Sequence, residues 1–566
     1  MSTRFTIALA QCNPTVGDLD GNSALIEQLW REAAEAGADL VVFPELALTG
    51  YPLEDLVLKP ALLERTASLL GELAAKTVEA GPAILLGAPW ADGKGRPYNG
   101  AFLLAAGEIK ARRAKHELPN YGVFDEKRVF AAGPVPGPMR LDLEGGGTVR
   151  IGAMVCEDMW TPDVAEGLEE SGAEILIVIN GSPFEATKQD VRLQHAVARV
   201  TETGLPLVYL NLVGGQDELV FDGASFALDA DRRLVAQAPW FEPALLLTTW
   251  ADDGDGFVPT GERSLATPPE PLDAIYRAMV LGLRDYVAKN GFPGVVLGLS
   301  GGVDSGLSAA VAADALGPER VHALMMPSRY TSEESLEDAR ESAALLGIEL
   351  DTVPIEPAFE AFGGMLAPLF GDRPPDTTEE NIQSRIRGLI LMAVSNKLGS
   401  MVLTTGNKSE MSVGYATLYG DMCGGYSVLK DVYKTTVFAL CHYRNSTRPE
   451  GCLGPEGMAV PLRTIEKPPT AELREGQKDE DSLPAYPLLD AILQGLIEDD
   501  FSAAELVEAG HPEDAVRRVS NLLDIAEYKR RQAPPGVKIT AKSFGRDRRY
   551  PITNHFRRLG SVDNLD

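Results

Sequence analysis

One segment of the sequence combines small residues and an acid in an order that suits phosphate binding. Residues 298–305 read GLSGGVDS and lie between an apolar run and a run of small residues. Glycines let the backbone approach a ligand closely, and amides at a helix N-terminus attract anions. The lysine of a Walker A loop is missing, whereas Asp304 could hold Mg²⁺ against phosphates. An ordinary glycine-rich turn is the alternative. The predicted phosphate-binding residues here are Gly298, Leu299, Ser300, Gly301, Gly302, Val303, Asp304 and Ser305.

Three residues in the first half could together hydrolyse an amide. Glu45 stands in VVFPELALTGYP, Lys115 in KHELPNYGVFDE and Cys156 in MVCEDMW. Cys156 could form a thioester as a thiolate. Glu45 could take the thiol proton and return one to the leaving ammonia, and Lys115 could stabilise the oxyanion. Alone, Cys156 could be core filler and Glu45 part of a solvated turn. Together, in this order and with these flanks, the three residues resemble the nitrilase superfamily, which implies a catalytic triad.

The apolar pattern of the first half predicts the elements that position this triad. Short apolar runs indicate strands over residues 5–11, 40–45, 83–89, 150–158, 174–181 and 207–213. An apolar face from Leu25 to Ala34 predicts a helix capped by Asn22 or Ser23. Residues 221–239 are typical of a hairpin. The Gly-, Pro- and Asp-rich stretch 251–270 is interpreted as an inter-domain linker.

The second half repeats a strand–helix–strand pattern. The expected strands cover residues 294–300, 321–327, 348–355 and 400–407, and the expected helices cover 305–317 and 381–399. Thr331 and Glu334 indicate a capping box before a further helix. Such alternation predicts a parallel sheet with helices on both faces.

Composition excludes several classes of protein. The 566 residues are too many for one core, and the net charge of −30 opposes binding to nucleic acid or an anionic membrane. The five cysteines are scattered and lack C-x-x-C spacing, which favours a reducing compartment over disulfides or zinc. The first residues lack the pattern of a signal peptide, and no apolar run approaches the ~18 residues of a membrane span. We therefore expect a cytoplasmic protein.

The two motifs resemble two known families. SGGVDS is similar to the pyrophosphate loop of the N-type ATP pyrophosphatases, and the order Glu45, Lys115, Cys156 with its flanks resembles the nitrilase superfamily. The resemblance implies an α/β protein with an N-terminal nitrilase-like α-β-β-α sandwich over 1–250. A linker over 251–270 and a doubly wound, Rossmann-like ATP pyrophosphatase domain over 271–566 would follow. The nitrilase resemblance also implies glutamine-binding residues, which are Tyr121, Ser182 and Lys188.

Longer motifs of the second half resemble glutamine-dependent NAD synthetases. They cover residues 381–388, 403–425, 429–435, 478–490 and 528–554. The resemblance implies a carbon–nitrogen ligase that hydrolyses glutamine and amidates deamido-NAD through an adenylate, giving NAD, AMP, pyrophosphate and glutamate. Further contacts to ATP are expected from Thr405 and Lys434, and Mg²⁺ is expected on Asp304 and Glu410. The residues expected to bind deamido-NAD are Asn381, Arg385, Glu410, Tyr415 and Lys529.

Some assignments stay open at this point. Arg385 could instead pair with Glu379 or Glu380, and Asp421 lies in a loop that differs from ammonia-only synthetases, which leaves metal placement there open. The resemblance implies a homo-oligomer formed through the synthetase domain. Two other functions compete. An RNA-modifying sulfur or nitrogen transferase is disfavoured by the net charge of −30, and a non-catalytic nucleotide sensor is disfavoured by the intact chemical residues.

Overall fold

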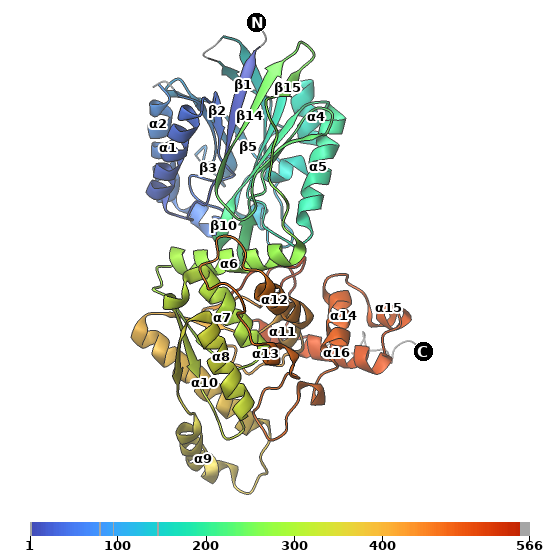
Figure 1. Cartoon of the computed structure of the whole chain (residues 1–566). Helices are drawn as coiled ribbons and strands as arrows, with labels where there is room; N and C mark the ends of the chain where they lie inside the picture. Colours follow the sequence, from blue (N-terminus) through green and yellow to red (C-terminus); the bar gives the residue numbers. More distant parts are fainter. Residues whose placement is uncertain (1–2, 79–80, 94, 144–145, 555–566) are drawn as a thin grey trace. The chain divides into compact units, whose positions relative to one another are not determined.

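The computed structural model describes residues 3–78, 81–93, 95–143 and 146–554. The chain forms two compact units, residues 1–269 and 270–566 (Figure 1). None of the helices in these described ranges is long and apolar enough to cross a membrane. All five cysteines lie in described segments and are free thiols.

The first unit contains two seven-stranded sheets. One has the order β15 (Phe257–Thr260), β14 (Ala244–Asp252), β1 (Arg4–Gln11), β2 (Leu40–Val42), β3 (Ala83–Trp90), β4 (Tyr98–Ala105) and β5 (Glu108–Ala114). The other has the order β16 (Ser264–Leu265), β13 (Leu234–Gln237), β12 (Phe226–Leu228), β9 (Leu207–Asn211), β8 (Ile175–Asn180), β7 (Thr148–Val155) and β6 (Met139–Asp142). A short ribbon, β10 (Val213–Gln216) with β11 (Leu219–Asp222), lies outside both sheets.

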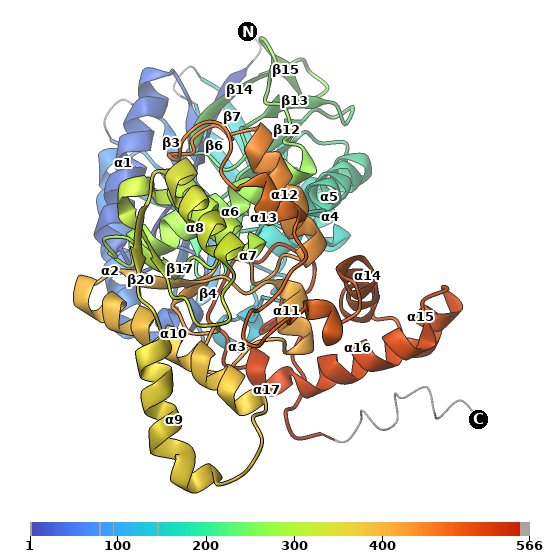
Figure 2. The same ribbon diagram turned by 60° about the horizontal axis from the view of Figure 1, so that its bottom comes forward.

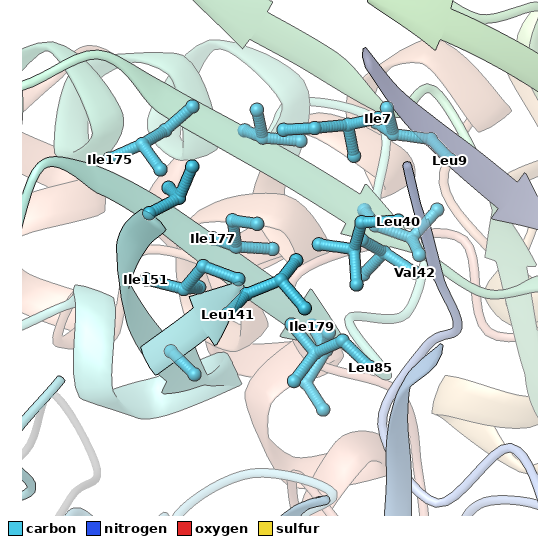
Figure 3. Close-up of a cluster of buried hydrophobic side chains, with 14 of the residues drawn as sticks. Ile7, Leu9, Leu40, Val42, Leu85, Leu141, Ile151, Ile175, Ile177 and Ile179 are labelled. Carbon is cyan, nitrogen blue, oxygen red and sulfur yellow. The ribbon is translucent and has the colours of Figure 1, made fainter. Parts of the chain in front are cut away.

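The two sheets pack face to face, with helices on their outer faces. Side chains of both sheets form one buried cluster, in which Ile7, Leu40 and Leu85 lie opposite Ile177 and Ile179 (Figure 3). The next residues along the same strands point outward and pack under α1 (Leu19–Glu35) and α2 (Pro60–Lys76). Helices α4 (Pro162–Glu170) and α5 (Lys188–Thr203) cover the second sheet. Because successive strand residues alternate between faces, strands buried on both sides are apolar throughout.

The predicted cap of the first helix is wrong. Helix α1 begins at Leu19, because the Asp18 side chain accepts a hydrogen bond from the backbone N–H of Gly21 at 3.0 Å. Asn22 lies inside the helix, buried, and its side chain bonds both backbone groups of Thr15.

The stretch 251–270, interpreted from its composition as an inter-domain linker, contains two strands. Strand β15 pairs with β14, and β16 pairs with β13, so most of the stretch is folded onto the first unit. Glycine and aspartate occupy the turn between β14 and β15, where Asp252 and Asp253 accept backbone hydrogen bonds. Turn residues thus look the same in a hairpin as in a linker.

The second unit is built on one parallel sheet. Its order is β19 (Glu349–Thr352), β18 (Val321–Met325), β17 (Val295–Gly298), β20 (Met401–Thr404) and β21 (Tyr426–Ser427), and every pair is parallel. Its main helices are α6 (Pro271–Lys289), α7 (Val303–Leu316), α8 (Glu333–Leu346), α9 (Glu356–Phe370), α10 (Thr377–Leu398), α11 (Lys408–Val413), α12 (Lys434–Ser446), α14 (Tyr486–Ile497) and α16 (Glu513–Ile525). The predicted parallel α/β architecture is confirmed.

The cap of α8 lies one residue from its predicted position. Ser332, not Thr331, accepts from the backbone N–H of Ser335 at 3.2 Å. The Thr331 hydroxyl instead accepts from the backbone N–H of Ser328, which closes the preceding turn.

Candidate active sites

Cys156 stands on a sharp turn directly after strand β7. Its φ angle is +48°, a left-handed conformation that non-glycine residues rarely adopt. Asp158, two residues further on, is buried and accepts hydrogen bonds from the backbone N–H groups of Val155, His116 and Glu117 at 2.8–3.0 Å. One carboxylate therefore fastens the cysteine turn to the loop that follows the predicted catalytic lysine.

Lys115 is fully buried between two carboxylates. Its Nζ donates to Oε1 of Glu45 at 2.8 Å and to Oε1 of Glu126 at 3.0 Å. Glu45 also accepts from the Asn99 side chain at 2.7 Å and, through its other oxygen, from the backbone N–H of Gly181 at 2.8 Å. All three predicted triad residues are therefore buried, and Glu45 and Lys115 are in direct contact.

Burial and neighbouring charges shift the pKa values of Lys115, Cys156 and Glu126. Burial alone would lower the pKa of Lys115, but the negative charges of Glu126 and Glu45 raise it well above its usual value. Burial raises the pKa of the Cys156 thiol, and Glu45 raises it further, while Lys115 opposes the change. Burial also raises the pKa of Glu126 to about 7 against the lowering effect of Lys115. The lysine is thus a fixed cation, and the thiol keeps its proton until a base removes it.

Two of the residues predicted to bind glutamine lie beside the residue that follows the cysteine. The Tyr121 hydroxyl donates to the Glu157 carboxylate at 3.0 Å. The Lys188 ammonium lies over the rings of Phe124 and Trp160, at 5.5 and 5.8 Å from their centroids, and its charge lowers the pKa of Glu157, which burial raises. The site thus offers an acid, a hydroxyl and a cation near Cys156.

Ser182 lies one residue beyond the glycine that donates to Glu45. Its hydroxyl accepts from Arg192 Nε at 3.1 Å, and Arg192 also donates to Asp222 at 2.8 Å. Both Ser182 and Arg192 are buried. The serine is therefore held in place by an ion pair rather than free to turn.

The loop SGGVDS joins strand β17 to helix α7 in the second unit. The hydroxyls of Ser300 and Ser305 lie 3.1 Å apart, and the Ser305 hydroxyl donates to the carbonyl of Gly302 at 2.9 Å. Gly301 has φ +81°, and a Cβ there would lie 2.2 Å from the carbonyl oxygen of Ser335. Only glycine fits this position, where the chain enters the N-terminus of α7.

Asp304 and Glu410, the predicted metal ligands, share one lysine. Lys434 donates to Asp304 Oδ2 and, at 3.1 Å, to Glu410 Oε1. The other oxygen of Asp304 accepts from the side chain of Asn407 at 2.8 Å. Asn407 is the N-cap of α11, and its own oxygen accepts from the backbone N–H of Glu410. Asn407 thus ties the loop acid to the helix that carries the second acid.

The electrostatics of this trio parallel those of the first unit. Burial alone would lower the pKa of Lys434, but Asp304 and Glu410 raise it above its ordinary value. Burial raises the pKa of Glu410 to about 7, which Lys434 opposes and Asp304 reinforces. Two carboxylates that converge on one cation are also a donor set that suits Mg²⁺, because hard cations prefer carboxylate oxygens.

The residues predicted to bind the dinucleotide gather around the segment after α11. Arg385 Nε donates to the carbonyl of Leu418 at 3.2 Å, not to Glu379 or Glu380 as the plainer interpretation suggested. Lys529 donates to the carbonyls of Gly414 and Ala416 at 2.6 and 2.7 Å.

Two further candidates touch the same region. Asn381 accepts from the Thr417 hydroxyl at 2.9 Å, and the Tyr415 hydroxyl donates to Asp479 at 3.1 Å. A cavity beside this segment is lined by Thr404, Glu410, Asp421 and Pro534, among others. Thr405 is the residue directly after β20. The structure therefore brings the predicted residues to one region of the unit.

Comparisons with known proteins identify two domains in the chain. The family model described as carbon-nitrogen hydrolase matches residues 6–251, and the one described as NAD synthase matches residues 275–533. The glutamine-dependent NAD(+) synthetase of Rhodobacter capsulatus is 52% identical over 560 residues, which cover 98% of this chain and 100% of the relative. That of Acinetobacter baylyi is 44% identical and covers 98% of this chain and 99% of its own. The chain belongs to the family of glutamine-dependent NAD(+) synthetases.

Solved structures of such synthetases share the fold. The structure of the Acinetobacter baumannii enzyme in complex with ADP is 41% identical, with a TM-score of 0.76 and coverage of 97% of this chain and 98% of that one. The Cytophaga hutchinsonii enzyme has a TM-score of 0.81 over 100% of both chains, at 22% identity. As a member of this family the chain is a ligase, and its nitrilase-like and NAD synthase domains confirm the predicted fold class.

Three polar residues of this synthetase were not assigned from the sequence. Glu126 lies inside the quoted motif KHELPNYGVFDE, yet an acid in a polar turn looks solvated until the fold buries it against Lys115. Asp158 closely follows Cys156, and Asn407 closely precedes Glu410, so proximity to a predicted site residue was a signal for both. The contacts of Asp158 to backbone groups and of Asn407 to Asp304 depend on the fold and could not be predicted from the sequence.

Proposed function

We propose that the first unit releases ammonia from glutamine at Cys156 and that the second uses ATP to amidate the nicotinate carboxylate of deamido-NAD. The observation that carries the proposal is that each unit gathers its own complete set of chemical residues. Lys115 joins Glu45 in one unit, and Lys434 joins Asp304 in the other. The whole-chain similarity to glutamine-dependent NAD(+) synthetases supports the same pairing.

In the first unit, Glu45 acts as base and then as acid. It accepts the Cys156 proton as the thiolate attacks the glutamine amide, and it returns a proton to the departing ammonia. The raised pKa of the thiol means that attack requires this transfer. Lys115, held as a cation by two carboxylates, stabilises the tetrahedral oxyanion. Water then attacks the thioester, again with Glu45 as base, and releases glutamate.

Recognition of glutamine follows from the groups that surround the cysteine. Lys188 supplies a cation for the α-carboxylate, and its ammonium is positioned over two aromatic rings. Tyr121 and Ser182 supply hydroxyls for the polar end of the amino acid. Ser182 is held by Arg192, so its position is set before glutamine arrives.

In the second unit, the amides of the SGGVDS loop and Lys434 bind the phosphates of ATP, and Thr405 contacts its adenosine. Asp304 and Glu410 would hold Mg²⁺, which when bound neutralises phosphate charge during attack on the α-phosphorus. The carboxylate of deamido-NAD displaces pyrophosphate and becomes an adenylate, and ammonia displaces AMP to give NAD. Adenylation is needed because AMP is a far better leaving group than the oxygen of a free carboxylate.

The dinucleotide itself is assigned to the region around residues 414–418. Asn381, Arg385 and Lys529 already contact backbone or hydroxyl groups of that segment. Tyr415 offers a ring face for the pyridine, while Asp479 holds its hydroxyl. Binding of the substrate would replace some of these internal hydrogen bonds with contacts to its own oxygens.

Two wider assignments belong to the same proposal. The chain works in the cytoplasm on small molecules, which its five free cysteines and net charge of −30 support. It forms a homo-oligomer through the synthetase unit, because α9 has no buried residue although Met365 and Leu369 are apolar (62% and 72% exposed). Figures 1 and 2 both show α9 at the periphery of that unit. Light scattering on Leu369→Lys against the parent chain tests this interface.

The test of the overall activity is an assay with deamido-NAD, MgATP and glutamine. We expect NAD, AMP, pyrophosphate and glutamate to appear in equal amounts when no ammonia is lost. Formation of ADP and phosphate instead would refute the adenylate, and failure with both glutamine and ammonium would refute the assigned activity.

A further inference from the structure

The ammonium of Lys434 lies where a metal ion on Asp304 and Glu410 would have to lie. Its side chain is 2% exposed, whereas those of Asp304 and Glu410 are 17% and 18% exposed. The ring of Tyr486 lies 5.1 Å from the same nitrogen, so carboxylates and an aromatic face surround the ammonium. The lysine is therefore held more deeply than the two acids that share it.

The contacts of the two acids show which oxygens this ammonium occupies. Asp304 Oδ2 and Glu410 Oε1 both accept from Lys434, while Asp304 Oδ1 is taken by Asn407. A cation bridging the two acids would take Asp304 Oδ2 and an oxygen of Glu410, and a divalent ion cannot take Asp304 Oδ2 at contact distance while the ammonium holds it. Binding of either cation thus excludes the other.

We propose that Lys434 is the resident counter-ion of the Asp304–Glu410 pair and keeps divalent metal off it until nucleotide binds. This inference rests on the proposed assignment of both acids as metal ligands. Phosphate gives the ammonium an alternative partner, so the carboxylates become available to the metal that accompanies ATP. Asn407 keeps Asp304 in place during this exchange, because its hydrogen bond uses the oxygen that the lysine does not contact.

The exchange has a structural basis in the helix that carries the lysine. Lys434 is the first residue of α12, and the backbone N–H groups of this turn are fixed by Ser409 and Asp490. The backbone is therefore anchored, while the four-carbon side chain can change rotamer. Lysine suits this task better than arginine would, because its ammonium is a compact point charge on a flexible stem.

The probe is Mn²⁺ alone, followed by electron paramagnetic resonance of the free ion, on the full chain without nucleotide. The parent chain is expected to bind Mn²⁺ weakly at this pair. Lys434→Met removes the competing charge but keeps the length of the side chain, and it should bind Mn²⁺ at least about tenfold more tightly. Lys434→Gln makes the same charge change if the Met variant does not fold, as judged by thermal unfolding.

Two controls show whether the gain in Mn²⁺ affinity arises at the Asp304–Glu410 pair. Lys529→Met also removes a cation from this unit, but Lys529 donates to backbone carbonyls, so no gain is expected. Adding Asp304→Asn to Lys434→Met should abolish the new site. The exposed trio His322, Glu349 and Asp351 could hold an ion and would give the same background in every variant.

The outcomes separate the inference from the function on which it rests. Tight binding of Mn²⁺ alone by the parent chain, lost in Asp304→Asn, would overturn the inference while the metal assignment stood. Equal Mn²⁺ affinity of the parent and both Lys434 variants would overturn it as well. If Asp304→Asn bound Mn²⁺ with a non-hydrolysable ATP analogue as well as the parent does, the metal assignment and the inference would both fail.

Discussion

Replacing Glu126 by Gln should stabilise the first unit at alkaline pH and remove its glutaminase activity. Glu126 is 5% exposed, and its pKa is raised from 4.5 to about 7, first by burial and against the effect of Lys115. The groups that face its carboxyl are Lys115, Tyr51 and, through charge, Glu45. A carboxyl whose pKa is raised on folding costs stability at any pH at which the unfolded chain has already ionised it.

The sign and size follow from proton linkage. Below about pH 4.5 both states keep the proton, and Glu126 contributes nothing. As the pH rises toward 7, the unfolded chain loses this proton first, so the free energy of unfolding falls. The full difference between 4.5 and about 7 corresponds to about 3 kcal/mol above pH 7. Gln removes this cost but loses about 1 kcal/mol of charge-assisted hydrogen bonding, which leaves a net gain of about 2 kcal/mol.

The assay exploits the distribution of tryptophan. All five tryptophans lie within residues 1–250, so their fluorescence during urea unfolding reports on the first unit alone. Glu126→Gln should exceed the parent chain in stability at about pH 8 and match or fall below it at about pH 5. Glu166→Gln, on the exposed face of α4, is the matched control and should follow the parent at both pH values. A variant less stable than the parent at pH 8 would refute the assigned pKa shift.

Catalysis gives the second half of the same prediction. Without Glu126, Lys115 keeps only one of its two carboxylate partners and loses its fixed position beside Cys156. Glutamine-supported NAD formation should fall by about 10²-fold or more, while ammonium-supported formation persists. Retention of glutamine-supported activity in a variant with the expected gain in stability would show that Glu126 is only a burial cost.

Three further substitutions test the remaining assignments. Cys156→Ala should abolish NAD formation from glutamine but leave formation from ammonium salt, and loss of both in a folded chain would contradict the separation of the two sites. Asp304→Asn should collapse synthesis from either nitrogen source, which a coupled assay of AMP release measures. Gly301→Ala should destabilise the second unit by about 1–3 kcal/mol and weaken ATP binding, because its Cβ would lie 2.2 Å from a carbonyl oxygen at φ +81°; unchanged ATP affinity would show that the loop adapts.

Hydrophobic patterns with periods of 2 and 3.6 residues predicted most strands and helices, because the burial of one or both faces of an element determines the residue types along it. Contacts between segments that are distant in the sequence were harder to predict from it. Asn22 and Asp18 are both good caps, and only the loop at Thr15 decides that Asn22 serves another purpose. The triad could be predicted because its flanks resemble a family, whereas Glu126 carried a local signal no stronger than that of any surface acid. Glu126 follows Lys115 by 11 residues in the sequence and contacts it only because the intervening chain folds back.

The two units solve one electrostatic problem in different ways. Each buries a lysine against two carboxylates, Lys115 with Glu45 and Glu126, and Lys434 with Asp304 and Glu410. In each trio one acid has a pKa near 7, because three charges that sum to −1 are poorly solvated when buried. The two trios differ in whether the lysine can be replaced by another cation. Lys115 and its partners are 0–6% exposed, so its charge stays in place and can act on an oxyanion. The acids of the second trio are more exposed, so a cation that arrives with a phosphate can replace the lysine there.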